Sequence, residues 1–286
     1  MTTRVAIVTG ASSGIGEATA RWLQNIGCTV YAAARRIERM EPLAELGVRP
    51  VRVDLTDDAS MVALVDRVIA ETGLVDVLVN NAGYGSYGAI EDVSLSEARR
   101  QFDVNLFGLA RLTQLVLPHM RSQRSGHIIN ISSIHGRMSA PLGGWYHSTK
   151  FAVEGLSDSL RMELASFGIR VVVIEPGPIR TEWSTIATDS LVATSGGGAY
   201  ANQAATVAKV LGSSAEHPSL GSSPDVIARV VAKAVTSRRP RTRYVVGRGA
   251  RPILLARRLL PDRGFDCLTS LAYRVVSRRS DRPAHP

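Results

Sequence analysis

A tyrosine and a lysine four residues apart are the residues of this sequence best suited to chemistry. The stretch YHSTK runs from Tyr146 to Lys150, and Ser133 precedes Tyr146 by 13 residues. Positions four apart share one face of a helix, which would bring the Lys150 ammonium beside the Tyr146 phenol. A cation there favours the phenolate, and lowering a phenol pKa from about 10 to neutrality needs about 4 kcal/mol, which requires a partly desolvated site. The spacing therefore indicates a tyrosine that acts as a general base, although the same pattern alone would also suit the start of an ordinary amphipathic helix.

A glycine-rich stretch, TGASSGIG over residues 9–16, follows the first apolar run of the chain. Glycines at such a turn let a pyrophosphate approach the first N–H groups of the next helix, where the helix dipole favours anions. The spacing G-x3-G-x-G differs from the usual dinucleotide pattern, so a plain glycine-rich turn stays open on this motif alone. A hydrolase nucleophile at Ser12 is excluded because that turn normally follows several strands, and a P-loop is excluded because no Gly-Lys-Ser/Thr follows.

Two arginines, Arg35 and Arg36, stand where the second apolar run ends. A dinucleotide fold that takes NAD normally places an acid near this point to hold the ribose 2′-hydroxyl. A pair of guanidinium groups instead suits a 2′-phosphate, both by charge and by bidentate geometry. The sequence thus favours NADP over NAD, with two solvated arginines at a helix start as the alternative.

In order and spacing, these motifs resemble the landmarks of the short-chain dehydrogenase/reductase family. The resemblance covers residues 5 to about 181, with general similarity to about 247. It rests on TGxxxGxG at residues 9–16, Asp54, NNAG at residues 80–83, Asn105, Ser133, YxxxK at residues 146–150 and PGxIxT at residues 176–181. It implies an enzyme that transfers a hydride between a nicotinamide and a carbonyl or secondary alcohol. A non-catalytic dinucleotide-binding regulatory or scaffold protein is the alternative, which the complete set of catalytic residues disfavours.

The resemblance also implies a role for each matching residue. Tyr146 gives or takes the proton, and Lys150 lowers the tyrosine pKa and binds the nicotinamide ribose. Ser133 donates to the substrate oxygen, and Asn105 positions a water that links Lys150 to solvent. Ser132 is the less favoured alternative for the active serine, because the spacing to Tyr146 favours Ser133. The residues expected to contact the cofactor are Gly10, Ser12, Ser13, Gly14, Ile15, Gly16, Arg35, Arg36, Asp54, Leu55, Asn81, Ala82, Gly83, Tyr146, Lys150, Pro176, Gly177, Ile179 and Thr181.

The elements that must position these residues alternate between apolar β-branched runs and longer amphipathic stretches. The expected strands are Val5–Val8, Thr29–Ala33, Val51–Asp54, Val77–Val79, His127–Ile131, Arg170–Ile174 and Tyr244–Val246. The expected helices are Ile15–Asn25, Ala59–Glu71, Glu97–Met120, Tyr146–Ser166 and Pro224–Ala234, and Ser94 with Glu97 forms a capping box. Uninterrupted apolar strands suit a parallel sheet covered on both faces. The chain is therefore predicted to be an α/β protein with a Rossmann-type, doubly wound parallel sheet of about seven strands flanked by helices.

One catalytic domain is expected over residues 1–248, and a basic, helical C-terminal extension over residues 249–286. Residues 182–223 are rich in small residues and weakly periodic, which is typical of a functional or mobile connection, and the resemblance implies that this stretch forms a lid over the substrate. Four apolar residues are expected to line the substrate pocket: Met138, Leu142 and Trp145, which are close to the catalytic residues in sequence, and Trp183, which lies in the stretch after Thr181. The tail resembles the extended ends of hydroxysteroid and retinol dehydrogenase-like members. Together these features favour a lipophilic alcohol or ketone as substrate.

The formal net charge of +9 belongs to the end of the chain. Residues 237–286 hold 13 Arg, no Lys or Glu and three Asp, a net of +10, so residues 1–236 carry a net of −1. The tail could dock on an anionic membrane surface, bind nucleic acid, form a subunit interface or close over the substrate cleft. A plain cap packed on the body is favoured over these. Nucleic acid is the least favoured partner, because no base-reading motif accompanies the arginines.

Several other classes of protein are disfavoured by the sequence. Two cysteines cannot build a disulfide framework or a cysteine-based zinc site, and no metal site is expected. The first residues run straight into an apolar strand, unlike a signal peptide, and no apolar run approaches the ~20 residues of a transmembrane helix. A cytoplasmic protein is therefore expected. Members of the family commonly assemble through helices such as Glu97–Met120 and Tyr146–Ser166, so a homodimer or homotetramer is expected.

Overall fold

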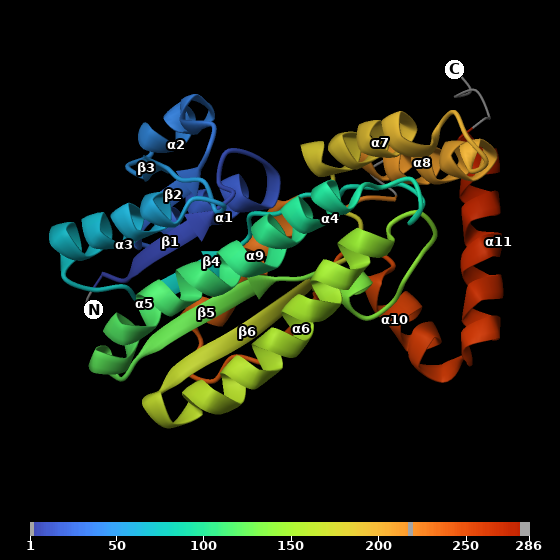
Figure 1. The fold of residues 1–286 in the computed structure, drawn as a ribbon. Helices are drawn as coiled ribbons and strands as arrows, with labels where there is room; N and C mark the ends of the chain where they lie inside the picture. The colour runs from blue at the N-terminus through green and yellow to red at the C-terminus, as the bar shows by residue number, and fades with distance from the viewer. Residues whose placement is uncertain (1–2, 217–219, 281–286) are drawn as a thin grey trace, which may run out of the picture.

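Seven parallel strands form one sheet in the computed structural model, which describes residues 3–216 and 220–280. The strand order is β3-β2-β1-β4-β5-β6-β7 (Figure 1). Successive strands are therefore added on one side from β1 to β3 and on the other side from β4 to β7, so the order reverses between β1 and β4. The strands are β1 Val5–Thr9, β2 Thr29–Ala34, β3 Arg49–Arg52, β4 Val77–Asn80, β5 Gly126–Ile131, β6 Ile169–Pro176 and β7 Arg243–Val246. The predicted Rossmann-type fold is confirmed, and a reversal of this kind opens a crevice at the carboxyl ends of the strands.

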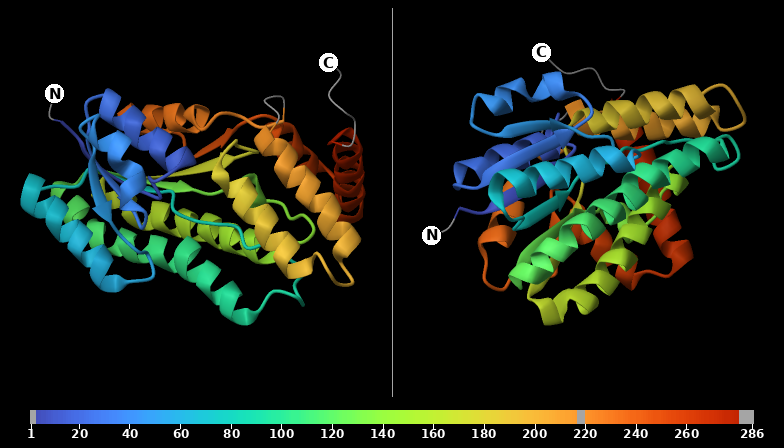
Figure 2. Two further views of the ribbon diagram at one scale, coloured as in Figure 1. Left: turned by 90° about the horizontal axis from the view of Figure 1, so that it is seen from above. Right: turned by 60° about the vertical axis from the view of Figure 1, so that its left-hand side comes forward.

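Helices cover both faces of the sheet, because successive side chains of each strand point to opposite faces. Ala6 and Val8 of β1 pack in a buried cluster under α1 (Gly14–Asn25) and α9 (Asp225–Thr236). Val5 and Ile7 pack instead in a second cluster under α3 (Asp58–Thr72), α5 (Leu109–Gln123) and α6 (Gly144–Leu164). Figure 2 shows these three helices on one face of the sheet and α1 and α9 on the other. Each fully buried aliphatic side chain contributes about 1.5–3 kcal/mol, so these two clusters hold the strand ends in place.

Two predicted elements differ from those in the structure. The third strand begins and ends two residues earlier than predicted, because Tyr31 pairs with Arg49, so Asp54 lies beyond the strand end. The single helix predicted at Glu97–Met120 is split into α4 (Leu95–Phe102), a π-helical segment over Asp103–Gly108 and α5. Ser94 caps α4 by accepting a hydrogen bond from Glu97 N at 3.2 Å. The Glu97 carboxylate, however, accepts from the Tyr84 hydroxyl at 2.9 Å, so only half of the predicted capping box forms.

Residues 182–223 contain two helices, α7 (Glu182–Ser195) and α8 (Ala201–Glu216), where the sequence predicted an irregular lid. The tail also forms two helices, α10 (Ala250–Leu259) and α11 (Asp262–Ser280). Figure 1 shows both pairs beyond the carboxyl ends of the strands, while the short α2 (Glu41–Ala44) lies at the opposite end of the molecule. A domain boundary at residue 248 stays a prediction. Ala250, Leu254 and Phe265 of the tail pack against Ile134 and Met138 of the body.

Candidate active site

One cleft with a volume of about 580 Å³ runs across the carboxyl ends of the strands. Residues that follow β1, β2, β4, β5 and β6 line it, together with residues of α7, α8, α10 and α11. The predicted cofactor residues among them are Gly10, Ser12, Ser13, Gly14, Ile15, Arg35, Arg36, Asp54, Leu55, Asn81, Ala82, Gly83, Tyr146, Lys150, Pro176, Gly177, Ile179 and Thr181. Gly16 is the one predicted cofactor residue outside this lining. The fold therefore gathers residues that are far apart in the sequence along one crevice.

The glycine-rich turn after β1 has a backbone that only glycine adopts readily. Gly10 and Gly14 have φ values of +65° and +58°, in the left-handed region. A side chain at Gly16 would place its Cβ 2.2 Å from the Gly10 carbonyl oxygen, so the packing of this turn also requires glycine there. Ser13, the N-cap of α1, makes no side-chain capping hydrogen bond. The first N–H groups of α1 therefore have no side-chain partner where the helix meets the cleft.

Thr9 ties the end of β1 to the end of β4. Its hydroxyl oxygen accepts hydrogen bonds from the backbone N–H groups of Asn81 and Ala82, both at 3.0 Å. The Asn81 side chain in turn donates a hydrogen bond to the Thr9 carbonyl at 2.9 Å. Asn81 thus acts on the backbone of the neighbouring strand, which fixes the two strand ends on either side of the crevice.

The arginines at the end of β2 face the cleft, and one of them contacts the first residue of α7. Arg36 lies 3.3 Å from the Glu182 carboxylate and donates to the Ser12 and Ser13 hydroxyls at 3.4 Å. Arg39 also pairs with Glu182, and its hydrogen bond is the main reason that the pKa of this carboxyl group is lowered. No sequence pattern indicated Glu182, because 146 residues separate it from Arg36.

Asp54 is held in a local turn at the same end of the cleft. Its carboxylate accepts from the Thr56 backbone N–H at 3.0 Å and from the Thr56 hydroxyl at 2.8 Å. Partial burial raises the pKa of Asp54, but these hydrogen bonds and the nearby Arg35 outweigh it, and the net shift is downward. Asp54 is therefore a fixed, ionised acceptor at the end of β3.

Ser133, Tyr146 and Lys150 meet at the other end of the cleft. Ser133 caps the turn after β5, and its hydroxyl acts to lower the pKa of the Tyr146 phenol, while the Ser132 hydroxyl is buried without a partner. The Lys150 ammonium donates to the Ile131 carbonyl at 2.9 Å and lies 5.9 Å from the centre of the Tyr146 ring. These contacts favour Ser133 over Ser132 as the serine that acts with Tyr146.

The pKa of Tyr146 is raised rather than lowered in this structure. Burial raises the pKa of the phenol to about 12, against the opposing effect of the Ser133 hydrogen bond. Lys150 was expected to lower that value, but its ammonium is bound to the strand backbone instead. Burial in turn lowers the pKa of Lys150 to about 8, and the Glu154 carboxylate opposes this shift. The structure thus holds Tyr146 as a protonated phenol at neutral pH.

Asn105 is positioned by the π-helical segment between α4 and α5. Its side-chain oxygen accepts from Tyr84 N at 3.0 Å, and its amide donates to the Tyr84 carbonyl at 2.9 Å and to the Thr149 hydroxyl at 3.1 Å. Gly83 lies directly beside it, where a Cβ would come within 3.0 Å of the Asn105 oxygen and 3.9 Å of the Lys150 nitrogen. Asn105 is therefore next to Lys150, as its implied role requires, and the π-helix explains how it reaches there.

A buried ionic cluster lies behind Lys150. Arg243 of β7 donates to the Glu154 carboxylate at 3.0 Å and lies 3.4 Å from Glu175, which is fully buried. Arg137 also pairs with Glu175, at 3.5 Å. Burial raises the pKa of Glu175, followed by the neighbouring Glu154, against the two arginines. The cluster joins α6, β6 and β7 and holds the Glu154 carboxylate close to Lys150.

The predicted substrate residues divide into two groups. Met138 and Trp183 line the cleft, and the Trp183 ring centre lies 4.9 Å from that of Tyr146. Leu142 and Trp145 are not among the residues that line it: Leu142 packs in an apolar cluster with Tyr87 and Tyr146, and Trp145 packs edge-on against Phe102 of α4. Sequence distance to the catalytic residues was a poor guide here, because α6 turns successive residues to different sides.

Other cleft residues could not be found from the sequence. His135 lines the cleft and stacks on His147 with ring centres 4.4 Å apart, and burial lowers the pKa of His135 to about 4. From the tail, Ile253 of α10 and Thr269, Ala272 and Tyr273 of α11 also line the cleft. One face of the tail therefore closes over the cleft, which was among the alternatives for it.

Within residues 3–216 and 220–280, no helix is long and apolar enough to cross a membrane. The same residues contain no group of three or more His, Cys, Asp or Glu that could hold a metal ion.

Known proteins resemble this chain over most of its length. A model of the short chain dehydrogenase family matches residues 4–190. Oxidoreductase BOA17 of Botryotinia fuckeliana is 37% identical over 86% of this chain and 89% of that protein. A 3-ketodihydrosphingosine reductase of Bacteroides thetaiotaomicron is 42% identical over 63% of this chain and 66% of that protein. An NADPH-dependent 3-dehydrocapnine reductase of Ornithobacterium rhinotracheale is 35% identical over 92% of this chain and 95% of that protein.

Solved structures show the same similarity in three dimensions. A short-chain dehydrogenase from Streptomyces avermitilis is 32% identical, covers 99% of this chain and 100% of its own, and has a TM-score of 0.78. A metagenomic short-chain oxidoreductase in complex with NADP is 30% identical, covers 85% of this chain and 96% of its own, and has a TM-score of 0.67. The first of these similarities includes the tail helices, since it extends over nearly the whole chain.

Proposed function

The chain belongs to the short-chain dehydrogenase/reductase family and is a dinucleotide-dependent oxidoreductase, and on this premise we propose that it uses NADPH to reduce a lipophilic ketone to a secondary alcohol. The observation that carries the proposal is the meeting of Ser133, Tyr146 and Lys150 at one end of the cleft that the predicted cofactor residues line.

The cleft residues fit a nicotinamide dinucleotide. The N–H groups at the start of α1, left without a side-chain cap, suit a pyrophosphate, and the left-handed glycines Gly10 and Gly14 keep the turn narrow. Asp54 suits the adenine, and Lys150 suits the hydroxyls of the nicotinamide ribose. When bound, the dinucleotide supplies the hydride, while the protein supplies position and electrostatics.

The side chains at the catalytic end suit proton donation to a carbonyl oxygen. Tyr146 holds a proton on its phenol oxygen at neutral pH, because burial raises its pKa to about 12. A protonated phenol can give its proton to an oxygen on which charge develops, and the Ser133 hydroxyl can donate a second hydrogen bond to that oxygen. Asn105, tied to the Tyr84 backbone, suits the binding of a water that would link Lys150 to solvent. These groups favour reduction as the direction of the reaction at neutral pH.

NADP is the proposed dinucleotide because of the charges at the end of β2. Arg35 and Arg36 both line the cleft, and both would suit a 2′-phosphate. The name of the NADPH-dependent relative from Ornithobacterium rhinotracheale and the NADP complex of the metagenomic oxidoreductase agree with this choice.

A lipophilic substrate is proposed because the cleft is largely apolar beyond the catalytic residues. Ile134, Trp183, Leu211 and Ile253 come from four separate parts of the chain to line it. The relatives named 3-ketodihydrosphingosine reductase and 3-dehydrocapnine reductase are named for ketones, which agrees with a ketone substrate here.

The test of the proposed function is the Tyr146→Phe variant, which removes the phenol hydroxyl and keeps the ring. A screen of NADPH oxidation over steroids, retinoids, quinones and aliphatic or aromatic ketones identifies an accepted substrate with the parent protein. Tyr146→Phe is expected to bind NADPH as the parent does and to lose about 10²- to 10⁴-fold in kcat/KM. Tyr244→Phe is the matched control, because Tyr244 lies on β7 outside the cleft lining. Unchanged turnover by Tyr146→Phe would overturn the catalytic assignment, and NADPH binding without turnover of any compound would favour a scaffold.

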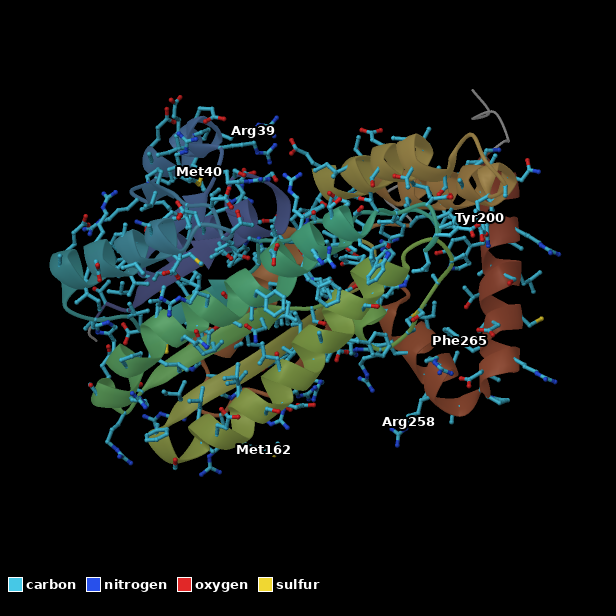
Figure 3. The ribbon with its side chains drawn as sticks, viewed as in Figure 1. Arg39, Met40, Met162, Tyr200, Arg258 and Phe265 are labelled. Atoms are coloured by element: carbon cyan, nitrogen blue, oxygen red, sulfur yellow. The ribbon has the colours of Figure 1, made fainter. Side chains whose placement is uncertain are left out.

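We also propose that the outer surface of the tail contacts an anionic membrane. On α10, Arg251, Leu255, Arg258 and Leu259 are exposed at spacings that share one helix face, and Leu255 and Leu259 are 56% and 71% exposed. Figure 3 shows Arg258 reaching away from the body. Exposed leucines between arginines are typical of helices that lie in the headgroup region of anionic bilayers.

A homodimer or homotetramer is proposed from exposed apolar side chains on the helices expected to form the interface. Phe107 is 59% exposed between α4 and α5, and on α6 Phe151 is 46% and Met162 68% exposed. Met162 points outward from α6 in Figure 3. Burial in a subunit interface would contribute about 1.5–3 kcal/mol of stabilising free energy for each large apolar side chain.

A cytoplasmic location stays a prediction.

A further inference from the structure

Two hydroxyl groups of α11 face the cleft. Thr269 and Tyr273 both line it, and they are four residues apart, so they share one face of the helix. Both lie outside residues 4–190, to which the family match extends. They are therefore features of this chain's tail, separate from the residues that the family motifs identify.

The Thr269 hydroxyl is buried without a hydrogen-bond partner. The residue is 8% exposed, and its Oγ1 atom makes no hydrogen bond. A helical threonine can satisfy itself by donating to the carbonyl four residues earlier. Thr72, Thr113 and Thr236 do so in this chain, with distances of 2.6, 2.8 and 2.9 Å. Thr19, Thr188 and Thr269 do not, and Thr269 is the one of these three that lines the cleft. A buried hydroxyl without a partner is costly unless a ligand or water supplies one.

Tyr273 brings a phenol to the same part of the cleft. Its side chain packs against the apolar cluster that contains Tyr146, Tyr87 and Leu191, with Trp183 beside it. Burial raises the pKa of the Tyr273 phenol to about 12, so this group is a hydrogen-bond donor throughout the neutral range. Tyr146, Thr269 and Tyr273 line the same cleft, so a molecule that reaches Tyr146 can also reach the two tail hydroxyls.

The surroundings of this part of the cleft carry no charge that would attract an ion. The charged residues among the described cleft-lining residues are Arg35, Arg36, Asp54, Lys150 and Glu182. Four of them belong to the end that suits the adenosine, and Lys150 is bound to the β5 backbone. His135 is neutral, because burial lowers its pKa to about 4. A ligand group that pairs with Thr269 and Tyr273 should therefore be uncharged.

We propose that Thr269 and Tyr273 bind an uncharged hydroxyl group that the substrate carries in addition to its reacting carbonyl. The enzyme then favours hydroxyketones with an apolar body over plain ketones of the same size. The proposal rests on the proposed function, because it concerns the substrate of the same cleft. A site built to hydrogen bond a hydroxyl discriminates strongly against the analogue that lacks it, since the protein groups are then left unpaired.

The test compares 2-dodecanone with a set of 2-dodecanones that carry one hydroxyl at successive positions along the chain. The measured quantity is the ratio of kcat/KM for each hydroxyketone to that for 2-dodecanone. At least one hydroxyketone is expected to be favoured about tenfold by the parent protein, which corresponds to about 1.4 kcal/mol. Thr269→Val, which keeps the size of the side chain, and Tyr273→Phe should each bring that ratio close to one.

Two controls separate hydrogen bonding from a structural role. Thr188→Val removes another hydroxyl without a partner, on α7 outside the cleft lining, and should leave the ratio unchanged. Thr269→Val should not lower Tm, because a methyl group replaces a hydroxyl that has no partner in the protein. A fall in Tm comparable to the loss of a buried hydrogen bond would overturn the proposal, since the hydroxyl would then already be paired.

Binding is measured separately from turnover, so that failure of this inference can be told from failure of the proposed function. In the Tyr146→Phe background, the thermal shift given by each hydroxyketone and by 2-dodecanone reports binding alone. A larger shift for a hydroxyketone, lost in the variant that also carries Thr269→Val, supports the proposal even without turnover. Equal shifts and equal kcat/KM values for all compounds would overturn it and leave ketone reduction standing.

Discussion

The contact between Arg36 and Glu182 allows the choice of dinucleotide to be tested in two opposite directions. If Arg35 and Arg36 bind a 2′-phosphate, their removal must weaken NADPH and leave NADH nearly unaffected. The Glu182 carboxylate lies 3.3 Å from Arg36 and would compete with the same phosphate for the guanidinium. Glu182→Gln should therefore strengthen NADPH binding, because it removes both the competitor and a negative charge near the phosphate.

The expected magnitudes follow from the exposure of these groups. Hydrogen bonds to charged groups contribute about 1.5–3 kcal/mol, and the lower end applies here because the Arg36 side chain is 42% exposed. Each arginine should then account for about tenfold in the Kd of NADPH, and Arg35→Ala with Arg36→Ala for about a hundredfold. The exposed Arg36–Glu182 pair is worth only about 0.2–1 kcal/mol, so Glu182→Gln should tighten NADPH about 1.5- to 5-fold.

The assay is the Kd of NADPH and of NADH, measured by calorimetry for the parent protein and each variant at one ionic strength. Arg67→Ala is the matched control, because Arg67 is 48% exposed, pairs with Glu71 and does not line the cleft. The ratio of the two Kd values is the decisive quantity. Equal weakening of both dinucleotides by the double arginine variant would refute the 2′-phosphate assignment. A loss of NADPH affinity in Glu182→Gln would refute the competition between the carboxylate and the phosphate.

Three further predictions concern catalysis, membrane contact and assembly. Burial lowers the pKa of the Lys150 ammonium to about 8, and the Glu154 carboxylate opposes this shift, so ketone reduction should decline as the pH rises through 8. Glu154→Gln removes the opposing charge and should move that decline to lower pH. A pH profile of kcat/KM that the variant leaves unchanged would contradict this prediction. The parent should float with vesicles of anionic lipid more than with vesicles of phosphatidylcholine alone, and Leu255→Glu with Leu259→Glu should abolish the difference while NADPH binding persists; equal recovery of both forms would exclude the membrane contact. Light scattering should show a dimer or tetramer that Phe107→Glu dissociates, and a parent that is a monomer would remove the assembly proposal.

The sheet could be read from the sequence because its signals are local. Apolar β-branched runs bounded by turn residues predicted all seven strands, and only β3 was placed two residues too far along the chain. The helix predicted at Glu97–Met120 was broken by a π-helical segment, which leaves no signature in hydrophobic periodicity. That segment is what turns Asn105 towards the loop that follows β4. Pattern reading therefore located Asn105 without showing how it is positioned.

The helices over residues 182–223 show a second limit. Their many small residues weaken the periodic pattern. Their helical form is stabilised by packing on each other and on residues beside the cleft, as the cluster around Leu191 and Val207 indicates. Trp183 was identified from the sequence because it closely follows the PGxIxT motif. Leu142 and Trp145 were assigned to the substrate by nearness in the chain, and they pack elsewhere because α6 and the turn before it direct them away from the cleft.

By itself, the sequence determined the family and the candidate catalytic residues, because motif spacing fixes which side chains meet on one helix or at neighbouring strand ends. Tyr146 and Lys150 share a face of α6, and Gly10 and Gly14 stand where only glycine suits the backbone. Only the tertiary structure decided which groups face these residues from far along the chain. It placed Glu182 against Arg36, bound Lys150 to the β5 backbone and brought Thr269 and Tyr273 into the cleft. Such pairings depend on how helices pack across the carboxyl ends of the strands, which no local pattern encodes.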